Sequence, residues 1–216
     1  MDISYILAVF QDLPGHLTQW TQSMGPWVYV LLFAIIFAET GLIVTPFLPG
    51  DSLLFAIGAL TAVEGGLSLS LCLGLLIIAA ILGDAVNYSV GRWLGTRLFK
   101  NPNSKIFNPD HLKKTQGFYI KHGGKTIILA RFVPIIRTYA PFVAGMGHMN
   151  YGKFASYNVV GAVLWIALFT IGGHLFGNLE SVKRNFHIVI LAILVLSVLP
   201  IAIEFLKARR AAQKEL

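Results

Sequence analysis

Charged side chains stand inside long apolar segments of this 216-residue chain. A charge held at the depth of a lipid bilayer costs at least about 2–3 kcal/mol, so such residues are candidates for a functional role. Carboxyl groups in that setting can take up and release protons, because desolvation favours their neutral form. Arginine stays charged, and its planar guanidinium binds phosphate through paired hydrogen bonds. The five candidates are Glu39, Asp51, Asp84, Arg131 and Arg137.

The two arginines flank a helix breaker in the segment "ARFVPIIRT". Pro134 lacks a backbone donor and should bend or end the helix between Arg131 and Arg137. The bend would turn both guanidiniums toward one cavity, where we predict that they bind a phosphate group. The alternative is that they only neutralise Glu39 and Asp51 as structural ion pairs. Both interpretations can hold, because a carboxylate can occupy an arginine until a substrate displaces it.

The acids Glu39 and Asp51 enclose the segment "ETGLIVTPFLPGD", which contains two prolines and a glycine. We predict that these acids exchange protons at mid-membrane depth and face the two arginines across one site. Each acid also has a simpler interpretation. Glu39 would be a helix-end acid at the membrane surface, and Asp51, in "GDS", would be the N-cap of the following helix.

The third acid, Asp84, lies in "GDAVNYSVGR", with Asn87 and Tyr88 one helical turn further on. We predict that these three residues support the site by hydrogen-bonding a spanning helix to a neighbouring hairpin. The sequence shows no Ser-His-Asp arrangement and no acidic or histidine cluster suited to a metal. We therefore expect no enzyme activity, no cofactor and no metal.

Composition indicates a membrane protein. The chain is 56% hydrophobic and 12% charged, whereas soluble domains carry about 25% charged residues. Lysine and arginine begin only at Arg92 and gather in segments 92–122 and 207–216. Basic segments beside membrane helices mark the cytoplasmic side. The positions of the basic residues therefore predict a cytoplasmic linker and C-terminus. They explain the net charge of +7 without a role in nucleic-acid binding.

The apolar runs predict one all-α membrane domain spanning residues 1–216. Runs of about 20 residues cross a hydrocarbon core of roughly 30 Å, while half-length runs ended by proline or glycine favour re-entrant hairpins. The predicted elements are an interfacial helix 1–24, re-entrant hairpins 27–63 and 125–150, spanning helices 68–91, 152–176 and 186–206, a cytoplasmic linker 92–122 and a basic cytoplasmic tail 207–216. Residues 1–24 would alternatively begin a first spanning helix.

A short pattern occurs in both hairpins. "TPFLPG" at 45–50 resembles "APFVAG" at 140–145, which sets Pro46 opposite Pro141 and Gly50 opposite Gly145. If the linker is cytoplasmic, the first hairpin enters from outside, with its tip near residues 44–52, and the second enters from the cytoplasm. Broken segments at corresponding places in two inverted halves indicate a transporter site at the midplane.

Three segments in order resemble the DedA family of bacterial inner-membrane proteins: "FAETGLIVTPFLPGDSLLF", "GDAVNYSVGR" and "ARFVPIIRTYAPFVAGMGHMNYGKFASYNVVGAVLW". The resemblance implies an inner-membrane location and two opposed re-entrant hairpins. It also implies a role in recycling undecaprenyl phosphate, with proton-motive force as the energy source in some members. The residues that the family requires map onto Glu39, Asp51, Arg131 and Arg137.

The leading hypothesis is a proton-coupled transporter that flips a lipid phosphate, with polyprenyl or phospholipid phosphates, membrane lipids and protons as partners. The alternative is a proton-coupled transporter of small ions or solutes. The chain lacks the residues expected of an enzyme that acts on lipid phosphates. A purely structural role as a scaffold would not explain the buried charges. The chain is compatible with a homo-oligomer.

Overall fold

The computed structural model describes residues 23–42, 50–63, 66–98 and 124–177, with residues 179, 180, 182, 188 and 192 beyond them. Every regular element in these ranges is a helix, as the all-α prediction requires. The helices are α3 (Trp27–Gly41), α4 (Gly50–Thr61), α5 (Leu69–Leu98), α7 (Lys125–Ala130), α8 (Pro134–Met146) and α9 (Tyr151–Phe176).

Several predicted features lie outside the described residues. They are the interfacial helix 1–24 apart from its last two residues, most of the tip at 44–52 with Pro46, the linker 92–122 from residue 99 onward, nearly all of the spanning helix 186–206, and the tail 207–216.

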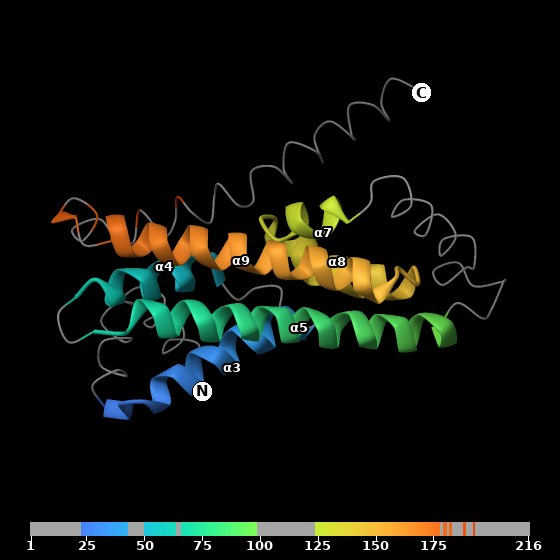
Figure 1. Ribbon diagram of the computed structural model, residues 1–216, viewed down its shortest axis with the longest axis horizontal. Coiled ribbons are helices and arrows are strands. Elements are labelled where there is room, and N and C mark those ends of the chain that lie inside the picture. Colours follow the sequence, from blue (N-terminus) through green and yellow to red (C-terminus); the bar gives the residue numbers. More distant parts are fainter. Residues whose placement is uncertain are drawn as a thin grey trace, which may run out of the picture.

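Two long helices, α5 and α9, form the axis of the molecule (Figure 1). Each contains a 26-residue apolar stretch, Leu69–Leu94 and Tyr151–Phe176. At about 1.5 Å per residue such a stretch is roughly 39 Å long, which exceeds the hydrocarbon thickness of about 30 Å. The predicted spanning helices 68–91 and 152–176 are therefore confirmed as helices, and α5 continues to Leu98.

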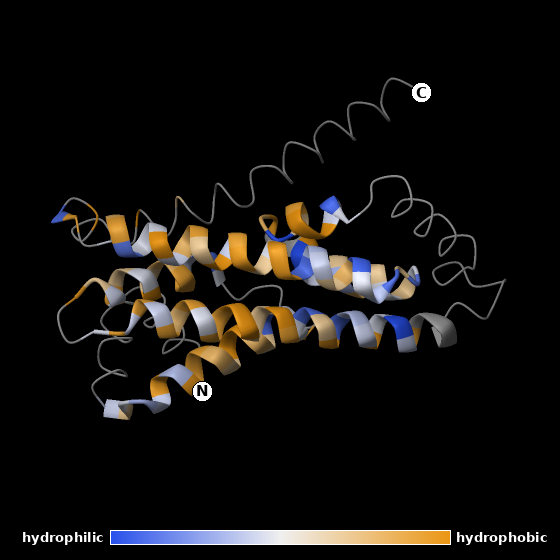
Figure 2. Cartoon of the chain, viewed as in Figure 1, coloured by the Kyte–Doolittle hydropathy of each residue, from blue (hydrophilic) through white to orange (hydrophobic). Residues whose placement is uncertain are grey.

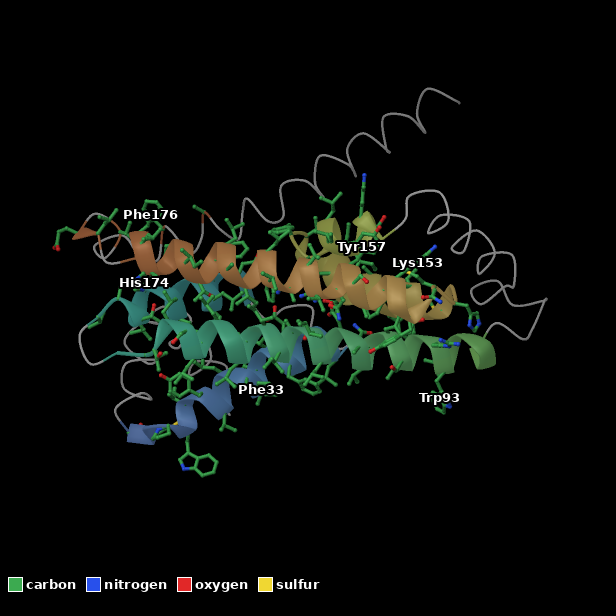
Figure 3. The ribbon with its side chains drawn as sticks, viewed as in Figure 1. Phe33, Trp93, Lys153, Tyr157, His174 and Phe176 are labelled. Atoms are coloured by element: carbon green, nitrogen blue, oxygen red, sulfur yellow. The ribbon has the colours of Figure 1, made fainter. Side chains whose placement is uncertain are left out.

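The outward faces of both long helices are apolar, as a lipid-facing surface requires. Many of the apolar side chains on these two helices are exposed. Figure 2 shows that hydrophilic residues are more frequent near the end where α5 finishes and α9 begins. Figure 3 places Trp93, Lys153 and Tyr157 toward that end, and His174 and Phe176 at the other. The exposed residues on α5 and α9 include Leu71, Ile78, Leu82, Val86, Val90, Val160, Leu164, Leu168, Ile171 and Leu175.

The other helices form two pairs, and each helix in them is too short to cross a bilayer. The pair α3–α4 has 15 and 12 residues, and the pair α7–α8 has 6 and 13. Figure 1 shows α3 and α4 along one half of the long helices and α8 along the other half. The first helix of each pair packs on the long helix that follows it, α3 on α5 and α7 on α9. The second helix packs on the opposite one, α4 on α9 and α8 on α5, so the two halves interlock.

The break in the second pair falls at Arg131–Val133, and Pro134 begins α8. This agrees with the prediction that Pro134 separates the two arginines. The segment "APFVAG" at 140–145, which resembles "TPFLPG" at 45–50, lies inside α8 with Pro141 in the helix interior. Proline is tolerated inside membrane helices when neighbouring groups satisfy the freed backbone. The break between the two helices of this pair lies before that segment, where Pro134 begins α8.

Glycines set the distance between the second helix of each pair and the long helix on which it packs. A Cβ atom at each of these glycines would overlap a backbone carbonyl of the facing helix. The contacts are reciprocal, since each carbonyl belongs to the residue three positions before the partner's own glycine. They join Gly58 to Thr170 and Gly173 to Phe55 between α4 and α9, and Gly145 to Tyr88 and Gly91 to Phe142 between α8 and α5.

These contacts correct the register of the internal repeat. Gly145 occupies the environment of Gly58, where the sequence pattern matched it with Gly50. Small residues let membrane helices approach closely and gain packing energy without a hydrophobic driving force. The repeat is therefore better defined by two equivalent helix crossings than by the shared Pro-Phe dipeptide.

We expect Gly173→Ala to lower the free energy of unfolding by about 1–3 kcal/mol, the usual range for an overpacked core. The added methyl would meet the Phe55 carbonyl, which belongs to backbone and cannot move aside. Gly172→Ala is the matched control, since no atom lies within 4 Å of its Cβ position. Thermal unfolding of the purified protein in detergent measures the difference, and equal melting temperatures for both variants would contradict the close crossing.

Candidate functional site

All five charged residues singled out in the sequence are buried, with between 2% and 8% of their surface exposed. They come from α3, α4, α5, the α7–α8 break and α8. Buried charges require partners, because removing an ion from water costs several kcal/mol that only close pairing offsets. The structure supplies the partners in two clusters.

In the first cluster Arg137 of α8 bridges both acids of the first helix pair. Its Nη1 donates to Asp51 Oδ1 at 2.7 Å, and its Nη2 donates to Glu39 Oε1. A guanidinium has several donors in one plane, which lets it hold two carboxylates at once. One side chain of the second pair therefore ties the end of α3 to the start of α4.

Glu39 also lies against the N-terminus of α4. Its Oε1 accepts a hydrogen bond from the backbone N of Gly50 at 3.1 Å. A Cβ atom at Gly50 would overlap the Glu39 carboxylate, so only glycine allows this approach. Negative groups are favoured at a helix N-terminus because the first N–H groups and the helix dipole point toward them.

In the second cluster Arg131 binds an acid and an amide from both long helices. Its Nη2 donates to Asp84 Oδ2 of α5 and to Asn158 Oδ1 of α9, each at 2.5 Å. The Asn158 amide in turn donates to the carbonyl of Ile81 at 3.1 Å. The expectation that both arginines face Glu39 and Asp51 is thus correct for Arg137 and wrong for Arg131. Sequence order alone does not indicate that Asp84 reaches the break after α7.

Trp165 of α9 lies between the two clusters. Its indole Nε1 donates to Asp51 Oδ1 at 2.8 Å. The guanidinium carbons of Arg131 and Arg137 stand 5.9 Å and 4.9 Å from the centre of its ring, within the range of cation–π attraction. Neither Trp165 nor Asn158 is among the site residues predicted from the sequence. A signal was present, since an amide and an indole seven residues apart share one face of an apolar helix.

Asn87 hydrogen-bonds α5 to two of the short helices, and Tyr88 bonds α5 to the segment between α8 and α9. Asn87 Nδ2 donates to the carbonyl of Thr40 at 3.2 Å and to that of Thr138 at 2.7 Å. Tyr88 donates its hydroxyl hydrogen to the carbonyl of Met149. One amide thus satisfies a carbonyl from each helix pair, beside Glu39 in one and beside Arg137 in the other. Pro141 lies inside α8 and makes no part of either charge cluster.

The two clusters are incompletely neutralised and incompletely bonded. Three carboxylates face two guanidiniums, which leaves one excess negative charge if every group is ionised. Several buried polar atoms find no hydrogen-bond partner in the described part of the chain. These atoms are Glu39 Oε2, Ser52 Oγ, Asn87 Oδ1, Arg131 Nε and Thr170 Oγ1. Unpaired buried polar groups are rare in folded proteins.

The Asp84–Arg131 pair can be tested by a double-mutant cycle. Arg131→Gln leaves Asp84 buried without its cation, and breaking a buried pair costs about 3–5 kcal/mol. We expect Asp84→Asn combined with Arg131→Gln to recover at least half of that loss, because no lone charge remains. Thermal unfolding in detergent measures the cycle. Additive losses in the double variant would show that the two side chains do not stabilise the fold as a pair.

Comparison with known proteins indicates the family to which the chain belongs. A model of the VTT domain matches residues 48–175. The chain is 56% identical to Protein DedA of Escherichia coli (strain K12), with 99% of each chain covered. It is 42% identical to an uncharacterized membrane protein of Mycobacterium leprae, over 77% of this chain and 74% of that protein. It is 38% identical to the inner membrane protein YqjA of Escherichia coli (strain K12), over 72% and 70% of the two chains.

No solved structure matches the chain. Two of these relatives are named as membrane proteins, one of them as an inner membrane protein, which supports the predicted location in a bacterial inner membrane. The match to the family model covers more than half of the chain, and it includes α4, α5, α7, α8 and most of α9. The chain belongs to the DedA family of VTT-domain membrane proteins.

Proposed function

We propose that the protein is a membrane transporter that flips a lipid phosphate, such as undecaprenyl phosphate, across the cytoplasmic membrane with coupling to the proton-motive force. One observation carries the proposal. Two arginines and three acids are buried together where two broken helix pairs meet between the long helices. Charged groups at such a place in a membrane protein mark a substrate or proton pathway.

The proposal treats each short pair as a re-entrant hairpin, with the two hairpins entering from opposite sides. At about 1.5 Å per residue, α3 is roughly 22 Å long and α4 roughly 18 Å, which is too short for a bilayer. The exchanged packing of α4 on α9 and of α8 on α5 supports two inverted halves. In this topology the linker 92–122 and the C-terminus lie in the cytoplasm.

The phosphate headgroup would bind at the arginines while the hydrocarbon tail remains in lipid. Arg137 contacts two carboxylates in the structure, so a phosphate competes with them for the same donors. Arg131 keeps a buried Nε without a partner among the described residues, which leaves one donor for an added anion. Phosphate would therefore exchange for the carboxylates and would not need a preformed empty pocket.

Charge balance supports proton coupling. The site holds one more acid than arginine, and a net charge in a medium of low dielectric constant is costly. A proton on Glu39 or Asp51 removes the excess charge and frees Arg137 for phosphate. Loading with a proton and loading with a phosphate thus favour each other.

A transporter of small ions or solutes is the second candidate. This second candidate is favoured because the charged side chains are buried within the described helices. A small ion needs a narrower opening to reach them than a lipid headgroup does. Neither candidate involves chemical conversion of the substrate.

The lipid assignment is tested with the full chain in liposomes that contain undecaprenyl phosphate, by measuring how much of the lipid is accessible from outside. We expect Arg137→Gln to slow flipping at least about tenfold, because a charge-assisted hydrogen bond contributes about 1.5–3 kcal/mol. Lys153→Ala is the matched control, since it removes an equal charge at an exposed position. Equal rates for wild type and Arg137→Gln would refute the headgroup site, and transport of soluble anions in place of the lipid would favour the second candidate.

Proton coupling is tested in the same liposomes with an imposed pH gradient. Asp51→Asn keeps the size of the side chain and its capacity to accept from Trp165, but it cannot exchange a proton. We expect this variant to move the lipid down its gradient without acceleration by the pH gradient. Acceleration equal to that of the wild type would exclude Asp51 from the coupling step.

A further inference from the structure

One indole side chain near the middle of α9 contacts both charge clusters. Trp165 is fully buried, and its helix packs on α4 of the first pair and on α7 of the second. Its Nε1 donates to Asp51 Oδ1 at 2.8 Å. The guanidinium carbons of Arg137 and Arg131 lie 4.9 Å and 5.9 Å from the centre of its ring. Trp165 is therefore a neighbour that the two clusters share.

The indole N–H contacts the acid of the first cluster. Asp51 Oδ1 accepts both from this N–H and from Arg137 Nη1, so one carboxylate oxygen has a neutral donor and a charged donor. Indole is a donor only, and it does not exchange a proton with the carboxyl group. When phosphate draws Arg137 away, as the proposed function requires, the indole N–H still orients Asp51 and favours its ionised form. Trp165 therefore affects the pH at which Asp51 takes up a proton.

The indole ring contacts the two arginines. A cation near the face of an indole is attracted to the ring, and this attraction leaves the N–H donors of a guanidinium available for hydrogen bonds. Two guanidiniums repel each other, and a ring that attracts both offsets part of the repulsion. The ring therefore keeps Arg137 and Arg131 close enough to act on one anion.

Arg131 is also held on α9 by contacts on either side of this ring. Asn158 accepts a hydrogen bond from its Nη2 at 2.5 Å. A Cβ atom at Gly161 would stand 3.0 Å from Arg131 Cδ, so the arginine side chain passes close to the backbone of α9. Arg131 is thus fixed against α9, and Trp165 is the residue of α9 that relates the position of Arg137 to it.

We propose that Trp165 is the positioning residue that joins the two clusters into one site. Its N–H sets the proton uptake of Asp51, and its ring holds Arg131 and Arg137 for one phosphate group. The inference rests on the proposed function for the identity of phosphate and proton as ligands of the site. Trp165 acts through these neighbours, so the two parts of the indole have effects that can be measured separately.

A change confined to the indole leaves the other charged and titratable groups around Asp51 in place. A shift in pH dependence caused by removal of the N–H would therefore arise at Asp51. These other groups are Arg137 of α8, Glu39 of α3, Arg131 between α7 and α8, Asp84 of α5, and His174 of α9, which contacts Thr61 at the other end of α4.

The test changes one part of the indole at a time, by incorporating tryptophan analogues at position 165 of the full chain. Benzothienylalanine has the shape of tryptophan with a sulfur atom in place of the N–H. Fluorinated tryptophans keep the N–H, but each added fluorine weakens the attraction of the ring for a cation. The same analogues at Trp27, which is 69% exposed, are the matched control. Melting temperatures in detergent establish that each protein is folded.

Flipping of undecaprenyl phosphate is measured in liposomes over a range of lipid content and of pH. We expect benzothienylalanine to move the pH of half-maximal flipping upward by about one unit, because the loss of a hydrogen bond to a charged group changes an equilibrium about tenfold. We expect trifluorotryptophan to raise the KM for the lipid about three- to tenfold, with smaller increases for fewer fluorines, as weaker cation–π attraction predicts.

The outcomes separate this inference from the proposed function. If both kinds of analogue leave the KM and the pH dependence as in the wild type, Trp165 has only a packing role and the inference is wrong. Equal effects of the analogues at Trp27 would also overturn it. If the wild-type chain moves no lipid, the proposed function fails, and calorimetric titration with farnesyl phosphate tests the inference instead. A stepwise loss of affinity with fluorination would then support the positioning of the arginines, and unchanged affinity would refute it.

Discussion

The contact between Arg137 and its two carboxylates constrains the rest of the structure. A guanidinium buried among apolar helices must remain paired, because a lone charge there costs several kcal/mol. Its two partners belong to different helices, Glu39 near the end of α3 and Asp51 at the start of α4. α8 must therefore lie where both helix ends can be reached. This requirement places the two broken pairs together at the centre of the bundle.

Close backbone packing makes these contacts possible for short side chains. Asn87 can reach carbonyls on both α3 and α8 only because its helix approaches both. On one side Gly83 stands against Thr40 and Gly41, and on the other Gly91 stands against Phe142. Glycine is thus what lets a two-carbon amide span helices that side chains would otherwise separate. The hydrogen bonds of Asn87 therefore depend on the close helix crossings that the glycines allow.

Composition and helix breakers indicated much of this arrangement from the sequence alone. The long apolar runs gave α5 and α9, and Pro134 gave the break that separates the arginines. Burial of all five charged residues followed from their place inside apolar segments. The pairing did not follow, because which acid meets which arginine depends on the exchanged packing of the second helices. The packing of α4 on α9 and of α8 on α5 depends on contacts between distant segments, and no periodic pattern in the sequence indicates it.

The register of the repeat was misread for a related reason. Pro46 and Pro141 share a dipeptide pattern, yet Pro141 lies inside α8 and marks no helix break. The glycines at the crossings were the better guide, because a Cβ there would overlap backbone that cannot move. Trp165 and Asn158 do not stand out in the sequence, since an indole and an amide are individually ordinary in a membrane helix. Their shared face became informative only once Arg131 and Asp51 were seen to lie beside it.

The helix crossings of α4 and α8 are equivalent, but the charges around the starts of these two helices are not. α4 and α8 make equivalent glycine crossings with α9 and α5. α4 begins with Gly50, whose N–H donates to a carboxylate, whereas α8 begins with Pro134, which has no N–H to donate. The acid excess also lies at the α4 end, with two carboxylates on Arg137 against one on Arg131. If the two halves move against each other, as the proposed function requires, this unequal distribution of charge would favour movement of one half when a proton or an anion binds.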